Sequence, residues 1–200
     1  NYLAAIEQYN YVLEYQPNAY SLRKNLGDCW LALKQYDKAK ESYEGAKNID
    51  PNVPNIYADI AYVAKEEGDL DAAVTNFRKA LSLKPDDKWK RSLAYALWNN
   101  KQIPEAIVVF NEIQEYSVSA YLYQGLGDAS NATASYQKAI ETNPKDTKSR
   151  FNLAHLYYEA RQFDKAKAEY EKLLEQKPND VEVMFLLAVL EQERGNINVA

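Results

Sequence analysis

The chain repeats itself at a nearly constant interval, and this period constrains its fold more than any other feature. Proline recurs at steps of 34, 34, 59 and 34 residues, at Pro17, Pro51, Pro85, Pro144 and Pro178. A fixed period of this size is typical of one supersecondary unit stacked on copies of itself. The sequence therefore predicts a solenoid, in which each unit contacts its neighbours, rather than a domain built around a single centre.

Each unit has the pattern of two antiparallel helices joined by a tight turn. Apolar or small residues recur at helical spacing over Tyr20–Leu33, and a second stripe covers Tyr36–Ile49. Asp50-Pro51-Asn52 ends the second helix, because proline disfavours helical backbone in the residue before it. Glycine is expected to end the first helix, and the next polar residue to cap the second, at Gly68-Asp69, Gly127-Asp128 and Gly195-Asn196.

Small residues and aromatic residues recur in phase with the prolines and predict how the units pack. A small residue in the first helix allows close approach of its neighbours, at Gly27, Ala61, Ala94, Ala120, Ala154 and Ala188. In the second helix an alanine precedes an aromatic residue by four positions, at Ala5/Tyr9, Ala39/Tyr43, Ala73/Phe77, Ala106/Phe110, Ala132/Tyr136 and Ala166/Tyr170. We expect each aromatic ring to fill the groove between units.

The series Leu26-Gly27, Trp30, Ala39, Tyr43, Ala46 and Pro51 resembles the tetratricopeptide repeat in order and spacing. The resemblance covers essentially the whole chain. It implies an all-α fold, an α-solenoid of antiparallel helix pairs stacked into a right-handed superhelix. It also implies a concave surface lined mainly by the first helix of each pair, and a peptide or protein as the partner.

The predicted organisation is one array over residues 1–200. It comprises the second helix of a partial repeat (1–17), then repeats 20–53, 54–87, 88–117, a shortened 118–146 and 147–180, and a partial repeat at 181–200. The shortening follows from the step between Ala106 and Ala132, which is only 26 residues. The second helix of the third repeat is expected to end near Glu115, and the next helix to run from about Val118 to Leu126.

Composition excludes several classes of function. The net charge of -5 argues against a duplex nucleic-acid binder, which needs clustered lysine and arginine. No apolar run approaches the length that spans a bilayer, so membrane insertion is not expected. With His155 as the one histidine and Cys29 as the one cysteine, metal sites built on clusters of these residues are excluded. We expect no cofactor and no catalytic activity, and the sequence does not indicate a compartment.

Helical phase predicts which side chains of the first helices line the concave face. Polar residues come first, followed by basic and aromatic ones, which suit an extended peptide with apolar anchors. The candidate binding residues are Asn25, Tyr62, Lys88, Arg91, Tyr95, Trp98, Lys148, Phe151, Asn152, His155 and Tyr158. The competing interpretation is that several of these aromatic residues merely pack between repeats.

One well-known binding mode of the family is not expected. The subgroup that grips the C-terminal carboxylate of chaperones needs asparagine where this chain has Asp28 and Asp59, and arginine where it has Ser92. Two carboxylates in that position would repel a third.

Three functional hypotheses follow. The first is a non-catalytic scaffold that binds a peptide or protein in the concave groove. The second is a targeting or regulatory segment of a larger enzyme or of a secretion or assembly machine. The third is self-association through the apolar C-terminal face around Val183–Leu190.

Overall fold

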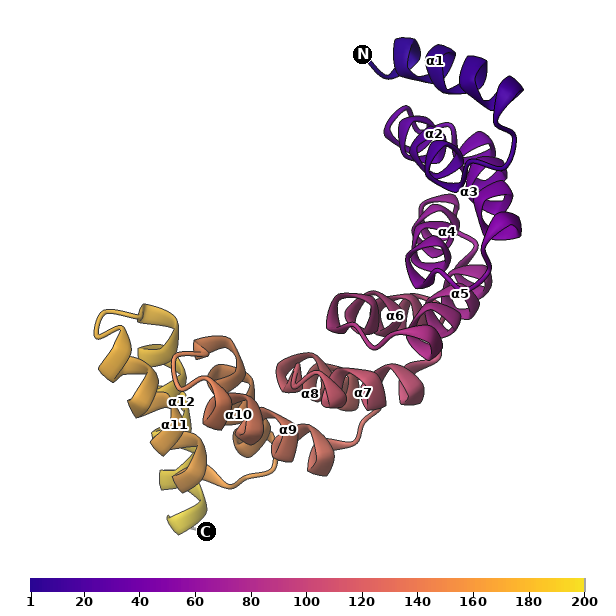
Figure 1. The fold of residues 1–200 in the computed structure, drawn as a ribbon. Helices are drawn as coiled ribbons and strands as arrows, with labels where there is room; N and C mark the ends of the chain where they lie inside the picture. The colour runs from indigo at the N-terminus through magenta and orange to yellow at the C-terminus, as the bar shows by residue number, and fades with distance from the viewer. Residues whose placement is uncertain (200) are drawn as a thin grey trace. The chain divides into compact units, whose positions relative to one another are not determined.

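The structure, a computed structural model, describes residues 1–199, with side chains described as far as Gly195. Over this range the chain forms twelve helices and no strand (Figure 1). It divides into two compact units, Asn1–Val109 (unit 1) and Phe110–Ala200 (unit 2). The first helices of the pairs, here the A helices, are α2 (Tyr20–Ala32), α4 (Pro54–Glu67), α6 (Asp87–Asn99), α8 (Tyr116–Gly125), α10 (Thr147–Glu159) and α12 (Val181–Val199). The second, or B helices, are α1 (Tyr2–Tyr15), α3 (Tyr36–Ile49), α5 (Leu70–Leu83), α7 (Ile103–Glu112), α9 (Ala129–Thr142) and α11 (Phe163–Gln176).

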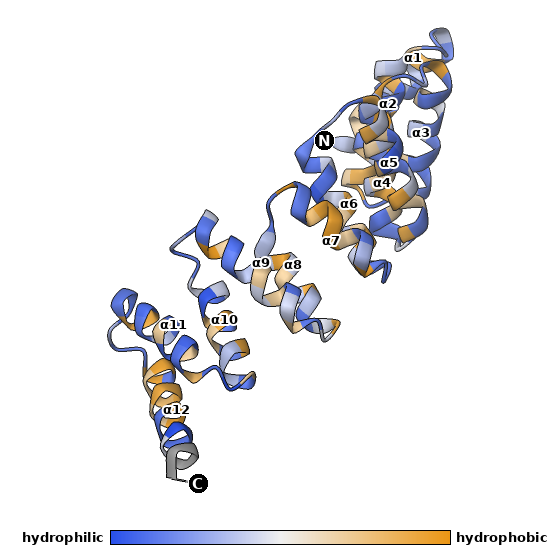
Figure 2. Ribbon diagram, turned by 90° about the horizontal axis from the view of Figure 1, so that it is seen from below, coloured by the Kyte–Doolittle hydropathy of each residue, from blue (hydrophilic) through white to orange (hydrophobic). Residues whose placement is uncertain are grey.

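Consecutive helices pack as pairs, as the period predicts. In unit 1, α2 lies against α3 and α4 against α5; in unit 2, α8 lies against α9 and α10 against α11. Hydrophobic and hydrophilic residues alternate along these helices (Figure 2), as expected for helices that bury one face. The all-α solenoid predicted from the sequence is confirmed.

The alanine–aromatic pairs form the core. In the five pairs from Ala39/Tyr43 to Ala166/Tyr170, each alanine is fully buried and each aromatic side chain is at most 1% exposed. The pair Ala5/Tyr9 in α1 is only half-buried. Gly27 has a defined steric role: a Cβ there would lie 2.5 Å from the Tyr43 ring.

The turns within pairs use left-handed backbone. Gly68 and Gly127 have φ of 86° and 74°, and Asp69 and Asp128 cap the helices that follow, as predicted. Non-glycine residues adopt the same conformation in the other turns, at Lys34, Lys101 and Arg161. The residue that follows each of these three donates its backbone amide to the carbonyl five positions before it, and this bond closes a Schellman motif. This motif makes the turn independent of glycine.

The short fourth repeat has a structural cause. Elsewhere a B helix ends in an extended residue before proline, as at Asp50 and Asn143. After α7, Gln114 is instead left-handed, and the Glu115 amide bonds to the Phe110 carbonyl at 2.9 Å. The link is thus of the tight kind used within pairs. Consequently α7 ends at Glu112, earlier than expected, and α8 begins at Tyr116 rather than at Val118.

The turn predicted at Gly195-Asn196 is wrong, because α12 continues unbroken from Val181 to Val199. Gly195 lacks the positive φ that ends α4 at Gly68. Ala188, which was expected to allow close approach of a neighbouring helix, is exposed.

Candidate partner-binding surfaces

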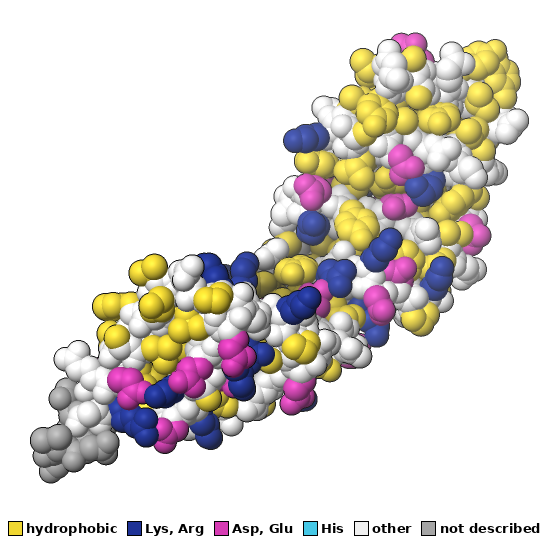
Figure 3. Space-filling model, turned by 90° about the vertical axis from the view of Figure 1, so that its left-hand side faces the viewer, with side chains coloured by type: hydrophobic (Ala, Val, Ile, Leu, Met, Phe, Trp, Pro, Cys, Tyr) yellow, Lys and Arg dark blue, Asp and Glu magenta, His cyan; other side chains and the backbone are white. Residues whose placement is uncertain are grey.

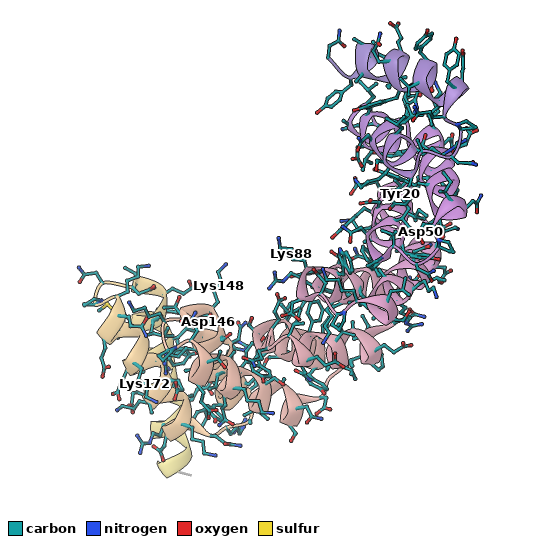
Figure 4. All side chains as sticks on the ribbon, viewed as in Figure 1. Tyr20, Asp50, Lys88, Asp146, Lys148 and Lys172 are labelled. Atoms are coloured by element: carbon teal, nitrogen blue, oxygen red, sulfur yellow. The ribbon has the colours of Figure 1, made fainter. Side chains whose placement is uncertain are left out.

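The candidate residues lie on A helices and form two sets, one in each unit. The unit 1 surface consists of Asn25 on α2, Tyr62 on α4, and Lys88, Arg91, Tyr95 and Trp98 on α6. The unit 2 surface consists of Lys148, Phe151, Asn152, His155 and Tyr158, all on α10. Lys88 and Lys148 each project outward from their helix (Figure 4). In Figure 3, lysine, arginine, aspartate and glutamate side chains lie among hydrophobic side chains on the face that is shown.

Beside Asn25, unit 1 holds a network of acidic, basic and phenolic groups. Lys24 Nζ lies 2.8 Å from Asp28 Oδ2 and 3.6 Å from Asp59 Oδ2. The Tyr43 hydroxyl donates to Asp28 Oδ1 at 2.7 Å. Lys24, the one basic residue at the first chaperone-clamp position, is therefore neutralised by the two carboxylates that replace asparagine there. This network explains why a third carboxylate is unfavourable at that place.

The pKa values in this network follow from burial and pairing. Burial raises the pKa of the Asp59 carboxyl above its usual value, although the Lys24 charge opposes this. Burial works to lower the pKa of Lys24, but the hydrogen bond to Asp28 and the charge of Asp59 outweigh it, and the net shift is upward. Lys24 thus stays protonated and held in place between its two partners.

The aromatic part of the unit 1 surface is only partly open. Tyr62 is half-buried, with its hydroxyl 3.1 Å from Ser92 Oγ and its ring edge-on to Phe77 at 5.1 Å. Tyr95 is 38% exposed and stacks on Trp98 at 6.0 Å between ring centroids. Ser92, the third departure from the chaperone clamp, is bonded within the fold. The exposed Tyr95 and the half-buried Trp98 form a stacked pair, whereas contacts with Ser92 and Phe77 hold Tyr62 against its neighbours.

In unit 2 the structure brings three candidate residues into one cavity. Lys148, Phe151 and Asn152 line a space of about 310 Å³, together with Thr147, Leu173, Asp180 and Val183. Phe151 is half-buried and packs edge-on to the Tyr170 ring at 6.1 Å. The cavity thus combines an apolar wall with an exposed amino group at its edge.

Asn152 is oriented by the core beneath it. Its Nδ2 donates to the Tyr136 hydroxyl at 3.1 Å, and that hydroxyl donates to Gln124 Oε1 at 3.1 Å. Because the amide nitrogen is engaged, the Asn152 oxygen is the group left to accept from a ligand. A peptide amide is the complementary donor.

His155 and Tyr158 lie outside the cavity lining. His155 Nδ1 is 3.5 Å from Glu159 Oε1, and its ring lies 6.4 Å from that of Tyr158. The Tyr158 hydroxyl donates to Glu193 Oε1 at 2.7 Å, a bond that raises the pKa of this phenol. Tyr158 therefore connects α10 with α12.

Sequence analysis missed the residues that neighbouring helices contribute to the cavity. Leu173 comes from α11, Val183 from α12, and Asp180 caps α12 by accepting from the Val183 amide at 3.4 Å. Asp180 also pairs with Lys177 at 2.8 Å, which lowers the pKa of its carboxyl. The repeated aspartate before A helices, at Asp86, Asp146 and Asp180, was the available signal, since each is an N-cap.

Comparison with known proteins places the chain in a family. A family model described as tetratricopeptide repeat matches residues 1–60 and 123–190, and a second with the same description matches residues 54–87. The chain belongs to the tetratricopeptide repeat family. Proteins with this fold are generally non-catalytic scaffolds that bind proteins or peptides.

Individual relatives match only part of the chain and at modest sequence identity. This tetratricopeptide repeat chain is 31% identical over 84 residues to BBSome complex member BBS4 of Bos taurus, a match covering 42% of the chain. The match spans only 16% of that relative's length.

Solved structures share the fold at low identity. YrrB, described as a TPR protein with an unusual peptide-binding site, has a TM-score of 0.65 at 15% identity, covering 90% of this chain and 98% of its own. Naa15/Naa10 bound to HypK-THB gives 0.73 at 15% identity, covering 96% of this chain and 31% of that one. A repeat protein of Parabacteroides merdae gives 0.63 at 20% identity, covering 88% and 73%.

The described residues of this repeat protein, 1–199, contain neither a candidate membrane span nor a candidate metal cluster. No helix there combines the length and apolar character that a membrane crossing requires. In the same part of the chain, no group of three or more histidine, cysteine, aspartate or glutamate side chains is arranged to hold a metal ion.

The repeat offers three tyrosines at equivalent core positions with different hydroxyl environments. Tyr43 donates to Asp28 and Tyr136 bonds to Gln124 and Asn152, whereas the buried Tyr170 hydroxyl has no hydrogen-bond partner among the described residues. We expect Tyr136→Phe to lower the free energy of unfolding by about 1–2 kcal/mol, because it removes a hydrogen-bond partner from two half-buried side chains, Gln124 and Asn152. Tyr170→Phe should cause no loss, since an unpaired buried hydroxyl is costly. Urea denaturation checks both; a larger loss in Tyr170→Phe would contradict the assignment.

The same tyrosines predict how stability depends on alkaline pH. Burial raises the pKa of Tyr170 from 10.0 to about 12, and burial together with the Asp28 hydrogen bond also raises the pKa of Tyr43. Between pH 10 and 12 the unfolded chain has lost a proton that the folded chain retains at Tyr170, so raising the pH favours unfolding. We expect the free energy of unfolding to fall across this window. Tyr170→Phe should fall less steeply; an identical slope would contradict the assignment.

Proposed function

We propose that this chain is a non-catalytic protein-interaction scaffold that binds an extended peptide or a protein segment along its A helices. The observation that carries the proposal is the unit 2 cavity, where Lys148, Phe151 and Asn152 meet. An apolar side chain of the ligand is placed against Phe151, Leu173 and Val183. The Asn152 oxygen accepts from the peptide backbone, and Lys148 attracts an acidic group beside the apolar anchor.

Physical arguments favour this kind of ligand. A rigid A helix held by a close-packed core needs little ordering on binding, so less entropy opposes association. The cavity is small, so it suits one side chain rather than a whole cofactor. In unit 1, the stacked pair Tyr95 and Trp98 together with Lys88 is proposed as a second contact region of the same basic and aromatic character.

The alternative is that the array serves as the targeting or regulatory part of a larger enzyme or assembly machine. One observation favours it: BBS4, which matches this chain, is by its name a member of a complex. The length of the natural gene product separates the two hypotheses. Self-association through α12, where Val181, Met184 and Phe185 are exposed, stays a prediction that light scattering over a range of concentrations tests.

Selection from a library of random linear peptides tests the main proposal. The full chain is the bait, and selected sequences are expected to share an apolar residue next to an acidic one. Selection of peptides without this pair, or failure to select any, would count against it.

A further inference from the structure

A second cavity lies in unit 1, and its lining belongs to none of the candidate residues above. It has a volume of about 540 Å³ and is lined by Asn18, Arg23, Gly45, Asn48 and Ile49. The lining contains one cation, two side-chain amides and no acidic residue. Such a set of donors is complementary to an anion.

The repeat itself shows how this position is normally filled. Two residues after the buried aromatic, the B helices α5, α9 and α11 carry lysine, at Lys79, Lys138 and Lys172. Lys79 lies over the Tyr57 ring at 5.8 Å, and Lys138 over the Tyr116 ring at 5.7 Å. In α3 the equivalent residue is Gly45. The lysine that occupies this sequence position in three other repeats is absent, and the cavity lies beside Gly45.

Arg23 takes the position of those aromatic rings, and Gly45 makes room for it. A Cβ on residue 45 would lie 2.8 Å from Arg23 Nη1. Arg23 Nε donates to the Pro17 carbonyl at 2.9 Å, as the Tyr57 hydroxyl does to Pro51. This bond anchors the guanidinium by one edge and leaves its terminal nitrogens to meet a ligand.

The fifth repeat contains the same arginine with its anion in place. Arg150 is equivalent to Arg23, and its Nη2 bonds to the Pro144 carbonyl at 3.3 Å. Arg150 Nη1 donates to Glu169 Oε2 at 2.6 Å, and Lys172 pairs with the same carboxylate at 2.7 Å. Glu169 therefore shows where a carboxylate sits on this arginine.

In the first full repeat that carboxylate is missing. The residue equivalent to Glu169 is Ser42, whose hydroxyl bonds to the carbonyl of Lys38 in its own helix. Within the described part of the chain Arg23 forms no ion pair, while the nearby Glu44 is paired with Lys47. We propose that the Arg23 cavity is a binding site for an acidic side chain of a protein partner, which takes the place that Glu169 holds on Arg150.

The site is tested by NMR on the full chain, with the backbone amides of Asn18, Gly45 and Asn48 as reporters. The probes are a capped Gly-Glu-Gly peptide, the matching Gly-Gln-Gly peptide and inorganic phosphate. We expect the glutamate peptide to shift these amides and the glutamine peptide to shift them about tenfold more weakly, because a charge-assisted hydrogen bond is lost. No shift with the glutamate peptide, or equal shifts with both peptides, would overturn the proposal. Stronger binding of phosphate would overturn the assignment to a carboxylate.

Two variants and a control complete the test. Arg23→Gln removes the charge, and Ser42→Glu supplies the internal carboxylate seen at Glu169; each should weaken binding of the glutamate peptide about tenfold. Ser42→Gln has the same shape without the charge and should weaken binding of the glutamate peptide much less than Ser42→Glu does. Equal loss in both Ser42 variants would contradict the proposal. These readouts involve no candidate residue of either A-helix surface, so their failure is separate from failure of the proposed function.

Discussion

Replacing Phe77 with alanine should lower the free energy of unfolding by about 3–5 kcal/mol, the usual cost of removing a buried phenylalanine. Phe77 is fully buried on α5, which packs against both α4 and α6. Its ring also supports Tyr62 on the unit 1 surface. Denaturation monitored by circular dichroism measures the loss.

The stacked-repeat fold also predicts which helices Phe77→Ala destabilises. In a solenoid, stability is approximately a sum of repeat and nearest-neighbour contributions. We therefore expect hydrogen exchange to accelerate in α4 to α6 of Phe77→Ala while α10 and α11 keep their protection. Val108→Ala is the control, since this side chain is 58% exposed and its truncation should change stability by less than about 0.5 kcal/mol. Uniform loss of protection along the chain would contradict the stacked-repeat account.

Reversing the charge of Lys148 should produce the largest loss of binding. We expect Lys148→Glu to weaken a peptide selected on the natural chain by about 30-fold or more, as for a central contact of an interface. Lys148 is exposed, so the helix and its packing should be unchanged. Isothermal titration measures the affinity, and thermal denaturation checks that the fold is intact.

A matched charge reversal separates a local contact from a general effect of net charge. Lys84 is exposed at the end of α5 in unit 1, away from the cavity lining. Lys84→Glu changes the net charge by the same amount and should leave the affinity within about threefold, as for a peripheral charge. Equal weakening by both variants would indicate that long-range attraction, rather than the cavity, holds the peptide.

Much of the fold was predictable because the packing rule repeats. The spacing of Ala39 and Tyr43 recurs in every unit, so one helix pair defines the others, and the bounds of α3 agree with those expected. The exceptions are local. Gln114 adopts a left-handed conformation that no glycine signals, and Gly195 lies inside a continuous helix without the positive φ that Gly68 has.

The candidate surfaces were less predictable than the core. Helical phase identifies the residues that one A helix presents, but the cavity also needs Leu173, Asp180 and Val183 from other segments. Phase likewise does not distinguish an open ring such as Tyr95 from Tyr62, whose contacts with Ser92 and Phe77 hold it in the fold. The Arg23 cavity depends on the absence of a side chain at Gly45. This becomes apparent only when the repeats are compared in three dimensions.

We propose that the A helices of this repeat protein bind a peptide whose anchor residue enters the unit 2 cavity. The most direct measurement is a crystal structure of the full chain with a selected peptide. The account predicts an apolar peptide side chain against Phe151, Leu173 and Val183, with an acidic neighbour beside Lys148. A peptide lying on the B helices α9 and α11, with this cavity empty, would contradict it.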